Sequence, residues 1–256
     1  MIDPRAIVDP GAEIGEGVEI GPFAVIGANV SIGAGSTIGS HAVVKGPTTL
    51  GRDTRVFQFA SIGDAPQDRK YAGEPTKLVV GDRNVFREFC TINRGTVGGR
   101  GVTTIADDCL FMAYSHVAHD CIVGSQCIMS NCTALAGHVE LGDWVIMSGY
   151  SGIHQFCKIG AHAFLANNAA VTRNVPPYLL VAGSPAEPKG VNSEGLKRRG
   201  FDAAQIANIK AAYRLLYRSG LKLADATEQL RALVPIQPEL KPFVDFLAAS
   251  ERSIIR

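Results

Sequence analysis

The feature that most constrains the fold of this chain is a run of aliphatic residues that recur every six positions. Ten of them follow one another without a break, and glycine comes directly after seven: Val8, Ile14, Ile20, Ile26, Ile32, Ile38, Val44, Leu50, Val56 and Ile62. An amphipathic helix repeats its apolar residues with a period of 3.6, and an exposed strand alternates with a period of two. Neither pattern accounts for a strict period of six, so the sequence predicts a hexapeptide solenoid.

The same phase returns at Val80, Phe86 and Ile92, and again from Ile105 to Val171. Two segments rich in Gly, Asp, Arg and Lys interrupt it, near residues 63–78 and 93–104, and we expect both to leave the body as loops. If three hexads make one turn, residues n and n+18 lie one above the other at the strand spacing of ~4.8 Å. This stacking rule predicts which side chains meet.

Each hexad has two inward positions, the aliphatic one, called i below, and a small one at i+4. Five of the six cysteines occupy i+4 and are predicted to be buried core residues: Cys90, Cys109, Cys121, Cys127 and Cys157. Cys109 and Cys127 are 18 residues apart and would stack within disulfide reach, but a cytosolic setting argues against a bond.

The hexad pattern stops after Val171, and the prolines of N-V-P-P-Y (174–178) are expected to end the strand ladder. We expect a solenoid domain over residues 1–186 and a helical domain over residues 187–256. Asp202 is a candidate N-cap for the first long helix, which Gly220 can stop. Two further helices are expected at 222–234 and 238–250.

Composition excludes several function classes. The 256 residues are 46% hydrophobic and carry a net charge of +1, so no broad field attracts nucleic acid or an anionic membrane. The N-terminus lacks the basic and apolar regions of a signal peptide, and no stretch approaches 18 apolar residues. We therefore expect a soluble, cytoplasmic protein with no stable membrane insertion.

Two histidines lie three residues apart in S-H-V-A-H-D-C (115–121), beside an aspartate. In the solenoid phase, four histidines fall at outward positions: His116, His119, His138 and His154. The stacking rule places Gly137 over His119 and His138 over Asp120. Polar groups and a glycine backbone therefore converge within one coil spacing.

This convergence permits two chemistries. Zinc bound by three histidines occurs in hexapeptide-repeat carbonic anhydrases, and His116, His119 and His138 could supply the ligands. The sequential pair of that family has four intervening residues, whereas two intervene here. Alternatively, a histidine beside a carboxylate can act as general base, and the N–H of Gly137 can receive an oxyanion.

A set of motifs extends over essentially the whole chain and resembles the acyl-carrier-protein–UDP-N-acetylglucosamine O-acyltransferases, which catalyse the first step of lipid A synthesis. The motifs are Q-D-R-K-Y-A-G-E-P-T (67–76), T-I-N-R-G-T (91–96), H-V-A-H-D-C (116–121), L-A-G-H-V (135–139), H-Q-F-C-K-I-G-A-H (154–162), N-V-P-P-Y (174–178) and G-V-N-S-E-G-L-K-R-R-G-F (190–201). The repeat alone is common to many acyltransferases, whereas this ordered set is specific.

The resemblance implies a homotrimer of left-handed parallel β-helices with active sites in clefts between subunits. The hand comes from the family alone, because crossover connections are generally right-handed. By the same resemblance, His119 is the general base, Asp120 orients its imidazole, and the N–H of Gly137 stabilises the oxyanion.

The resemblance also implies a set of substrate contacts: Asp68, Lys70, His116, His138, His154, Gln155, Asn192, Glu194, Arg198 and Arg199. Asn167 matches the position that limits acyl-chain length, where relatives that take longer chains have glycine. Its side chain predicts a 3-hydroxyacyl donor of about ten carbons. The partners are acyl carrier protein and UDP-N-acetylglucosamine. No metal or other cofactor is expected, because the donor thioester is already activated.

Two other functions compete with this one. The related N-acyltransferases of the same pathway carry an extra N-terminal domain, for which a solenoid starting at residue 8 leaves no room. A solenoid that only binds or assembles would not need the polar convergence at His119. Loss of activity in His119→Ala would separate a catalyst from a scaffold, and metal analysis would test the zinc alternative.

Overall fold

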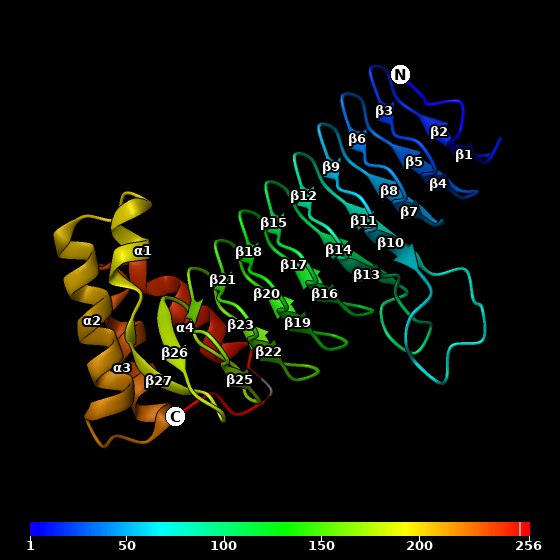
Figure 1. The fold of residues 1–256 in the computed structure, drawn as a ribbon. Coiled ribbons are helices and arrows are strands. Elements are labelled where there is room, and N and C mark those ends of the chain that lie inside the picture. The colour runs from blue at the N-terminus through cyan, green and yellow to red at the C-terminus, as the bar shows by residue number, and fades with distance from the viewer. Residues whose placement is uncertain (251) are drawn as a thin grey trace.

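The computed structural model describes residues 1–250 and 252–256, which form a solenoid of stacked coils with helices at its C-terminal end (Figure 1). The strands of successive coils pair in parallel, and Ile14 lies beside Ile32 while Val117 lies beside Leu135. Both pairs are 18 residues apart, as three hexads per turn require. The prediction of a hexapeptide-repeat parallel β-helix with a helical C-terminal part is confirmed.

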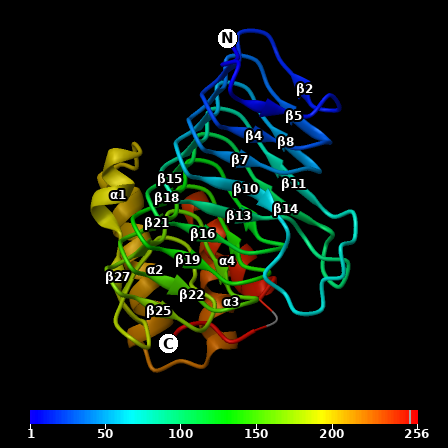
Figure 2. The same cartoon turned by 45° about the vertical axis from the view of Figure 1, so that its right-hand side comes forward.

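The strands form three sheets, which become the three faces of the solenoid (Figures 1 and 2). The first sheet contains β1 (Ile7–Val8), β4 (Val25–Ile26), β7 (Val43–Val44), β10 (Ser61–Asp64), β13 (Thr91–Asn93), β16 (His116–Val117), β19 (Ala134–Leu135), β22 (Gly152–Ile153) and β25 (Ala170–Val171). The second contains β2 (Glu13–Ile14), β5 (Val30–Ile32), β8 (Thr48–Leu50), β11 (Lys77–Val80), β14 (Val102–Ile105), β17 (Ile122–Val123), β20 (Glu140–Leu141) and β23 (Lys158–Ile159). The third contains β3 (Glu19–Ile20), β6 (Thr37–Ile38), β9 (Arg55–Val56), β12 (Val85–Phe86), β15 (Leu110–Phe111), β18 (Ile128–Met129), β21 (Ile146–Met147), β24 (Phe164–Leu165), β26 (Leu179–Ala182) and β27 (Glu187–Val191).

The core runs along the inside of the coils and consists of the two predicted inward positions. Side chains at position i, such as Ile62 and Leu135, are completely buried. Burying one such side chain contributes about 1.5–3 kcal/mol. The five i+4 cysteines are buried as predicted, and all six cysteines, which lie within the described residues, are free thiols.

The glycine that so often follows position i has a steric cause. At Gly33, a Cβ atom would lie only 2.6 Å from the backbone nitrogen of Arg52 on the next coil. Any larger residue would push adjacent coils apart at this point. The frequent Ile-Gly pairs therefore reflect coil stacking.

Both interruptions of the repeat leave the body as predicted, and they protrude beside β10 and β13 in Figure 1. The first lies between β10 and β11, and the second lies between β13 and β14. Across these loops the stacking interval changes, and Thr91 of β13 pairs with His116 of β16, 25 residues later.

The prolines after Val171 do not end the ladder. Leu180 of β26 pairs in parallel with Phe164, so the third sheet gains a further strand after N-V-P-P-Y. The two prolines fall outside the strands, so their missing N–H groups cost no ladder hydrogen bond. Strand β27 then turns back antiparallel to β26.

The C-terminal helices begin at Ser193. They are α1 (Ser193–Arg198), α2 (Ala203–Arg218), α3 (Leu223–Leu233), the 3₁₀ helix η1 (Pro238–Leu240) and α4 (Lys241–Ala248). Asp202 caps α2 as predicted, in a reciprocal capping box with Gln205, and Gly220 follows with a positive φ of 76°. The helices expected at 222–234 and 238–250 correspond to α3 and to η1 with α4.

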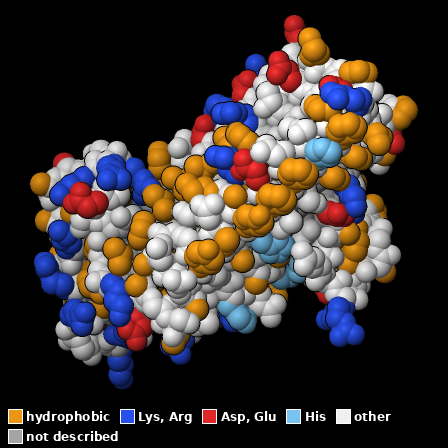
Figure 3. Space-filling model, viewed as in Figure 1, with side chains coloured by type: hydrophobic (Ala, Val, Ile, Leu, Met, Phe, Trp, Pro, Cys, Tyr) orange, Lys and Arg blue, Asp and Glu red, His pale blue; other side chains and the backbone are white. Residues whose placement is uncertain are grey.

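The corners of the coils repeat one backbone conformation, because the residue at i+3 has a positive φ in most hexads. At the corner that follows the third sheet, five of these residues stack their rings in an exposed row, with centroids 4.9 to 5.3 Å apart. They are Phe23, His41, Phe59, Phe89 and Tyr114. A broken row of hydrophobic side chains is visible along the solenoid in Figure 3.

Within the part of the chain that the structure describes, none of the helices combines the length and the hydropathy needed to cross a lipid bilayer.

Candidate functional site

The histidine cluster lies on two neighbouring coils, in the turns that follow β16 and β19. His119 Nδ1 lies 2.9 Å from Asp120 Oδ2, and His138 Nε2 lies 4.0 Å from the same oxygen. The two imidazoles meet edge to face, with centroids 5.0 Å apart. The backbone N–H of His138 donates to the backbone carbonyl oxygen of His119, which confirms the stacking of the two coils that the sequence predicted.

Asp120 is the buried centre of this cluster, and its side chain has no exposed surface. The backbone N–H of Thr96 reaches both carboxylate oxygens at 3.1 Å, and the Thr96 hydroxyl donates to Oδ2 at 2.6 Å. The N–H of Arg100 donates to Oδ1 at 2.9 Å. Burial alone would raise the pKa of Asp120, but hydrogen bonds from Thr96 and His119 hold this pKa below its ordinary value. Asp120 is therefore a carboxylate at neutral pH.

Gly137 lies directly against the imidazole of His119, as the stacking rule predicted. A Cβ at this position would lie 2.6 Å from Cε1 and 2.7 Å from Nε2 of that ring. Only glycine leaves the ring in place. Among the described residues, the N–H of Gly137 donates to no backbone or side-chain acceptor.

The imidazoles of His116 and His138 are neutral at physiological pH. His116 Nδ1 lies 2.7 Å from the hydroxyl of Thr91, on the coil below. Burial lowers the pKa of His116. Burial also lowers the pKa of His138, although the nearby charges of Asp120 and Asp68 act in the opposite direction. Asp68, on the first protruding loop, is therefore close to the cluster.

Two cavities open beside the cluster. One, of about 550 Å³, is lined by Arg100, Asp120, Ile122, His138, Glu140, His154, Gln155, Phe156, Lys158, Asn174 and Arg252. The other, of about 750 Å³, lies over the outer face of the first sheet. Its floor consists of small residues that stack from coil to coil, namely Ala134, Gly152 and Ala170. His154 lines both cavities, so the two are contiguous at this residue.

Four of the predicted substrate contacts gather elsewhere, around a cavity of about 450 Å³ on the outer face of the third sheet. Asn192, Glu194, Arg198 and Arg199 line it together with Trp144 and Phe164. The Arg199 guanidinium lies 5.0 Å from the centre of the Trp144 ring. Sequence reasoning missed Trp144, the only tryptophan of the chain.

Some of these side chains already have structural partners. Asn192 caps α1 by accepting from the N–H of Gly195, and its amide donates to the carbonyl oxygen of His162. Glu194 forms an exposed ion pair with Lys197. Within one chain, the histidine cluster and the arginine pair occupy different faces of the solenoid, and no residue lines both the histidine cavities and the arginine cavity.

The remaining predicted residues lie at exposed positions. Lys70 follows Asp68 on the first loop, and its N–H donates to the Asp68 carboxylate at 3.0 Å. Asn167 is exposed in the turn after β24. The adjacent Asn168 lines the cavity over the first sheet, together with Tyr150.

The zinc alternative predicts three histidine ligands, His116, His119 and His138, but the side chains whose ligand atoms lie close together are a different set. Among the described residues, His119, Asp120 and His138 offer ligand atoms within 4.8 Å of one another. His116 is not part of this group.

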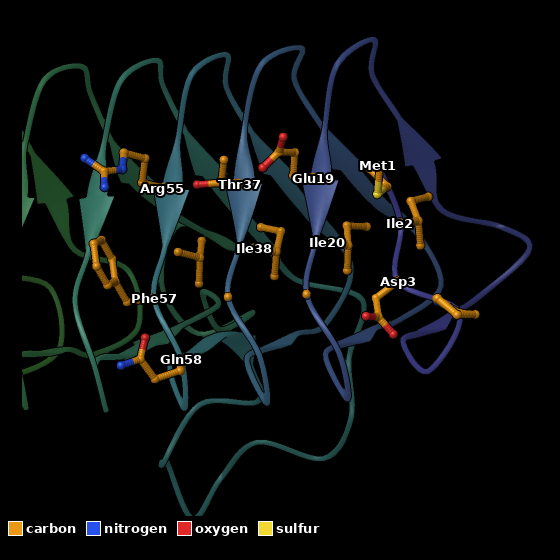
Figure 4. A pocket seen from close by; sticks show the side chains of 14 residues that line it. Met1, Ile2, Asp3, Glu19, Ile20, Thr37, Ile38, Arg55, Phe57 and Gln58 are labelled. Carbon is orange, nitrogen blue, oxygen red and sulfur yellow. The ribbon is translucent and has the colours of Figure 1, made fainter.

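A further hollow of about 510 Å³ lies on the first coils, at the N-terminal end of the third sheet (Figure 4). Glu19, Thr37 and Arg55 follow one another along its wall, on β3, β6 and β9. None of the predicted site residues lines this hollow. It is therefore separate from the histidine cluster on β16 and β19.

The repeat and the C-terminal helices together define a hexapeptide-repeat transferase. Residues 11–46 match the family model described as bacterial transferase hexapeptide, six repeats. Residues 174–255 match the model described as UDP N-acetylglucosamine O-acyltransferase, domain 2.

Full-length relatives identify the family more closely. The chain is 56% identical over 207 residues to the acyl-[acyl-carrier-protein]–UDP-N-acetylglucosamine O-acyltransferase of Stenotrophomonas maltophilia, covering 80% of this chain and 79% of the relative. It is 53% identical over 218 residues to the enzyme of the same name from Verminephrobacter eiseniae, covering 84% and 83%. The chain belongs to this family of O-acyltransferases.

Solved structures of UDP-N-acetylglucosamine acyltransferases have the same fold as this chain. The UDP-N-acetylglucosamine acyltransferase of Francisella novicida superposes with a TM-score of 0.98 at 42% identity, covering 100% of this chain and 94% of that one. The UDP-N-acetylglucosamine O-acyltransferase of Moraxella catarrhalis gives 0.97 at 40% identity, covering 100% and 99%.

Proposed function

We propose that this protein transfers a 3-hydroxyacyl chain of about ten carbons from acyl carrier protein to the 3-hydroxyl of UDP-N-acetylglucosamine, the first step of lipid A biosynthesis in the cytoplasm. The names of relatives up to 56% identical support the donor and the acceptor. The donor is already a thioester, so the proposed reaction uses no cofactor.

The observation that carries the proposed mechanism is the short contact between His119 and Asp120. A carboxylate can only accept hydrogen bonds, so the ring proton of the neutral imidazole resides on Nδ1, 2.9 Å from Asp120 Oδ2. Nε2 then carries the free lone pair. His119 is therefore oriented to accept a proton, and Asp120 stabilises the imidazolium that forms.

In the proposed reaction, the sugar hydroxyl oxygen attacks the thioester carbonyl carbon while His119 Nε2 removes the hydroxyl proton. The carbonyl oxygen becomes an oxyanion, which the unengaged N–H of Gly137 can stabilise. When the intermediate collapses, the carbon–sulfur bond breaks and the imidazolium returns its proton to the leaving thiolate. A positioned base typically contributes ~10²–10⁴ in rate.

The separation of the two halves of the site supports an oligomer in which neighbouring subunits share each cleft, and the family resemblance implies that the subunits are three. His116, His138, His154 and Gln155 lie at the first-sheet side of the solenoid, whereas Arg198 and Arg199 lie over the third sheet. One sugar nucleotide can contact both sets only if they come from different subunits. Each cleft would then combine the histidine cluster of one chain with the arginine pair of its neighbour.

Two further features fit the substrates. The forked guanidinium groups of Arg198 and Arg199 suit a pyrophosphate. Figure 3 shows Lys and Arg side chains gathered over the helical end, a charge distribution that suits an acidic carrier protein. Asp68 and Lys70 lie on a loop that reaches the histidine cluster, where they can contact the acceptor sugar and the acyl chain.

The test is mass spectrometry of the product formed from UDP-N-acetylglucosamine and a competing mixture of 3-hydroxyacyl carrier proteins. A single acylated sugar nucleotide of about ten carbons, absent with His119→Ala, is the expected result. A longer chain would overturn the role of Asn167 but keep the enzyme. No product from a folded trimer that contains stoichiometric zinc would favour a metal site at His119, Asp120 and His138.

A further inference from the structure

The second protruding loop, between β13 and β14, closes over the carboxylate of Asp120. Three donors from this loop reach the carboxylate: the N–H and the hydroxyl of Thr96, and the N–H of Arg100. The imidazole of His119 is the fourth donor. The backbone N–H groups that reach this carboxylate all come from the loop.

The loop between β13 and β14 also packs closely against Asp120. Thr96 is buried, with 6% of its surface exposed. A Cβ atom on Gly99 would lie 2.5 Å from the carboxyl carbon of Asp120 and 2.6 Å from Cε1 of His138. The loop backbone therefore packs directly against both groups, and its position and that of the carboxylate depend on each other.

The Thr96 hydroxyl and the His119 imidazole share one acceptor. Both donate to Oδ2, at 2.6 Å and 2.9 Å, while the Arg100 N–H fixes Oδ1. These bonds determine the rotation of the carboxylate and therefore the direction in which it holds His119. Hydrogen bonds to the ionised form also favour that form, and charge-assisted bonds of this kind are the stronger ones.

Other charged and titratable groups also lie around Asp120. His138 lies 4.0 Å from Oδ2, and Asp68 approaches His138 from the first loop. His116 lies on β16, the strand that leads into the turn holding His119, and the Arg100 side chain lines the adjoining cavity. Among these groups, only His119 shares a carboxylate oxygen with Thr96 at hydrogen-bond distance.

We propose that the loop between β13 and β14 exists to position Asp120 and that Thr96 is its positioning residue, which aims the carboxylate at His119. This inference rests on the roles of His119 and Asp120 in the proposed function. Thr96 touches neither substrate in this scheme, and it acts only through Asp120.

The test compares Thr96→Val, which removes the hydroxyl at nearly constant volume, with Thr96→Ser, which keeps it. Thr54→Val is the matched control, because Thr54 is likewise a buried threonine but lies between β8 and β9, away from the cluster. For Thr96→Val we expect kcat to fall roughly tenfold with KM nearly unchanged, from the loss of one hydrogen bond to a charged group. Thr96→Ser should restore kcat, and Thr54→Val should leave it unchanged.

A second measurement follows Asp120 directly, by its side-chain carbon resonance during an acid titration of the trimer. In Thr96→Val the carboxylate loses a donor, so its midpoint should move to higher pH, and Thr96→Ser should reverse the change. If Thr96→Val does not fold, Gly99→Ala replaces it, because the added methyl group forces the same loop away from Asp120. The same fall in kcat and the same upward movement of the midpoint are expected.

The outcomes separate this inference from the proposed function. If His119→Ala and Asp120→Asn abolish transfer while Thr96→Val keeps both wild-type kcat and the wild-type Asp120 midpoint, Thr96 has no positioning role. Equal losses in Thr96→Val and Thr96→Ser would also overturn it, since the hydroxyl would then be irrelevant. If His119→Ala retains full activity, the proposed roles of His119 and Asp120 fail, whereas the absence of transfer by the wild-type protein would overturn the proposed function.

Discussion

The sharpest prediction concerns Gly137→Ala, which tests how closely the base must be positioned. The new Cβ would lie 2.6 Å from Cε1 of His119. Non-bonded carbon atoms are optimally separated by about 3.5 Å or more, so the ring must retreat by about 0.9 Å. The ring is the end of a side chain and can move, so the change should affect catalysis more than folding.

A displacement of about 1 Å in a catalytic group can cost about 10² in rate. That factor corresponds to about 2.7 kcal/mol of lost transition-state stabilisation. We therefore expect kcat of Gly137→Ala to fall about 100-fold, with a melting temperature close to that of the wild type. The assay is steady-state kinetics with the carrier-protein thioester, beside thermal unfolding of the same preparation.

The chain offers a matched control in Gly149→Ala. Gly149 occupies the same position of its hexad as Gly137, and neither has a positive φ. A Cβ at Gly149 would meet only the carbonyl oxygen of Asn131, at an ordinary 3.5 Å. If Gly137→Ala keeps wild-type kcat, the reasoning about His119 is refuted. If both variants lose activity equally, the loss reflects a glycine requirement of the coil instead.

Three further predictions follow from other parts of the chain. Asn167→Gly should shift the product toward longer acyl chains in the mass-spectrometric competition assay, and an unchanged product would contradict the role of Asn167. Because the pKa of Asp120 is lowered in the folded state, its contribution to stability is complete above the ordinary carboxyl pKa of about 4 and is lost as pH falls through the lowered pKa. Urea unfolding between pH 7 and 3 should therefore show a weaker pH dependence in Asp120→Asn, and an identical dependence would show that Asp120 is not a main source of acid sensitivity. The five cysteines at position i+4 are buried, and burial raises the pKa of Cys90 to about 11 and of Cys121 to about 12. In the folded protein a thiol reagent should therefore modify only the partly exposed Cys132, and Cys132→Ser should abolish that reaction.

The repeat made much of this structure predictable, because a strict period fixes both the direction and the neighbours of each side chain. The placement of Gly137 over His119, and of His138 over Asp120, followed from adding 18 to a residue number. The rule fails across the two protruding loops, where Ser61 pairs with Thr91 at an interval of 30 and Thr91 pairs with His116 at an interval of 25. Three of the four donors that hold Asp120 come from one of these loops, so no spacing in the sequence could reveal them.

The C-terminal part shows a second limit. Proline patterns indicate where ladder hydrogen bonds cannot form, but they do not indicate whether the sheet resumes afterwards, as it does in β26. Trp144 was missed for a similar reason. Its contact with Arg199 joins the solenoid to the residues that follow α1, and neither repeat period nor helix pattern relates these two segments.

The location of the cluster follows from the backbone of the repeat. Asp120 and His138 both occupy the i+3 corner of their hexads, with φ near +60°. Asp, Asn and His are the non-glycine side chains that tolerate this conformation best. The corner is left-handed in most coils, so the fold already requires this conformation whether or not a catalytic group is present. A carboxylate and an imidazole can therefore be placed on adjacent corners at little additional cost in stability, and coil stacking then brings them within 4.0 Å of each other.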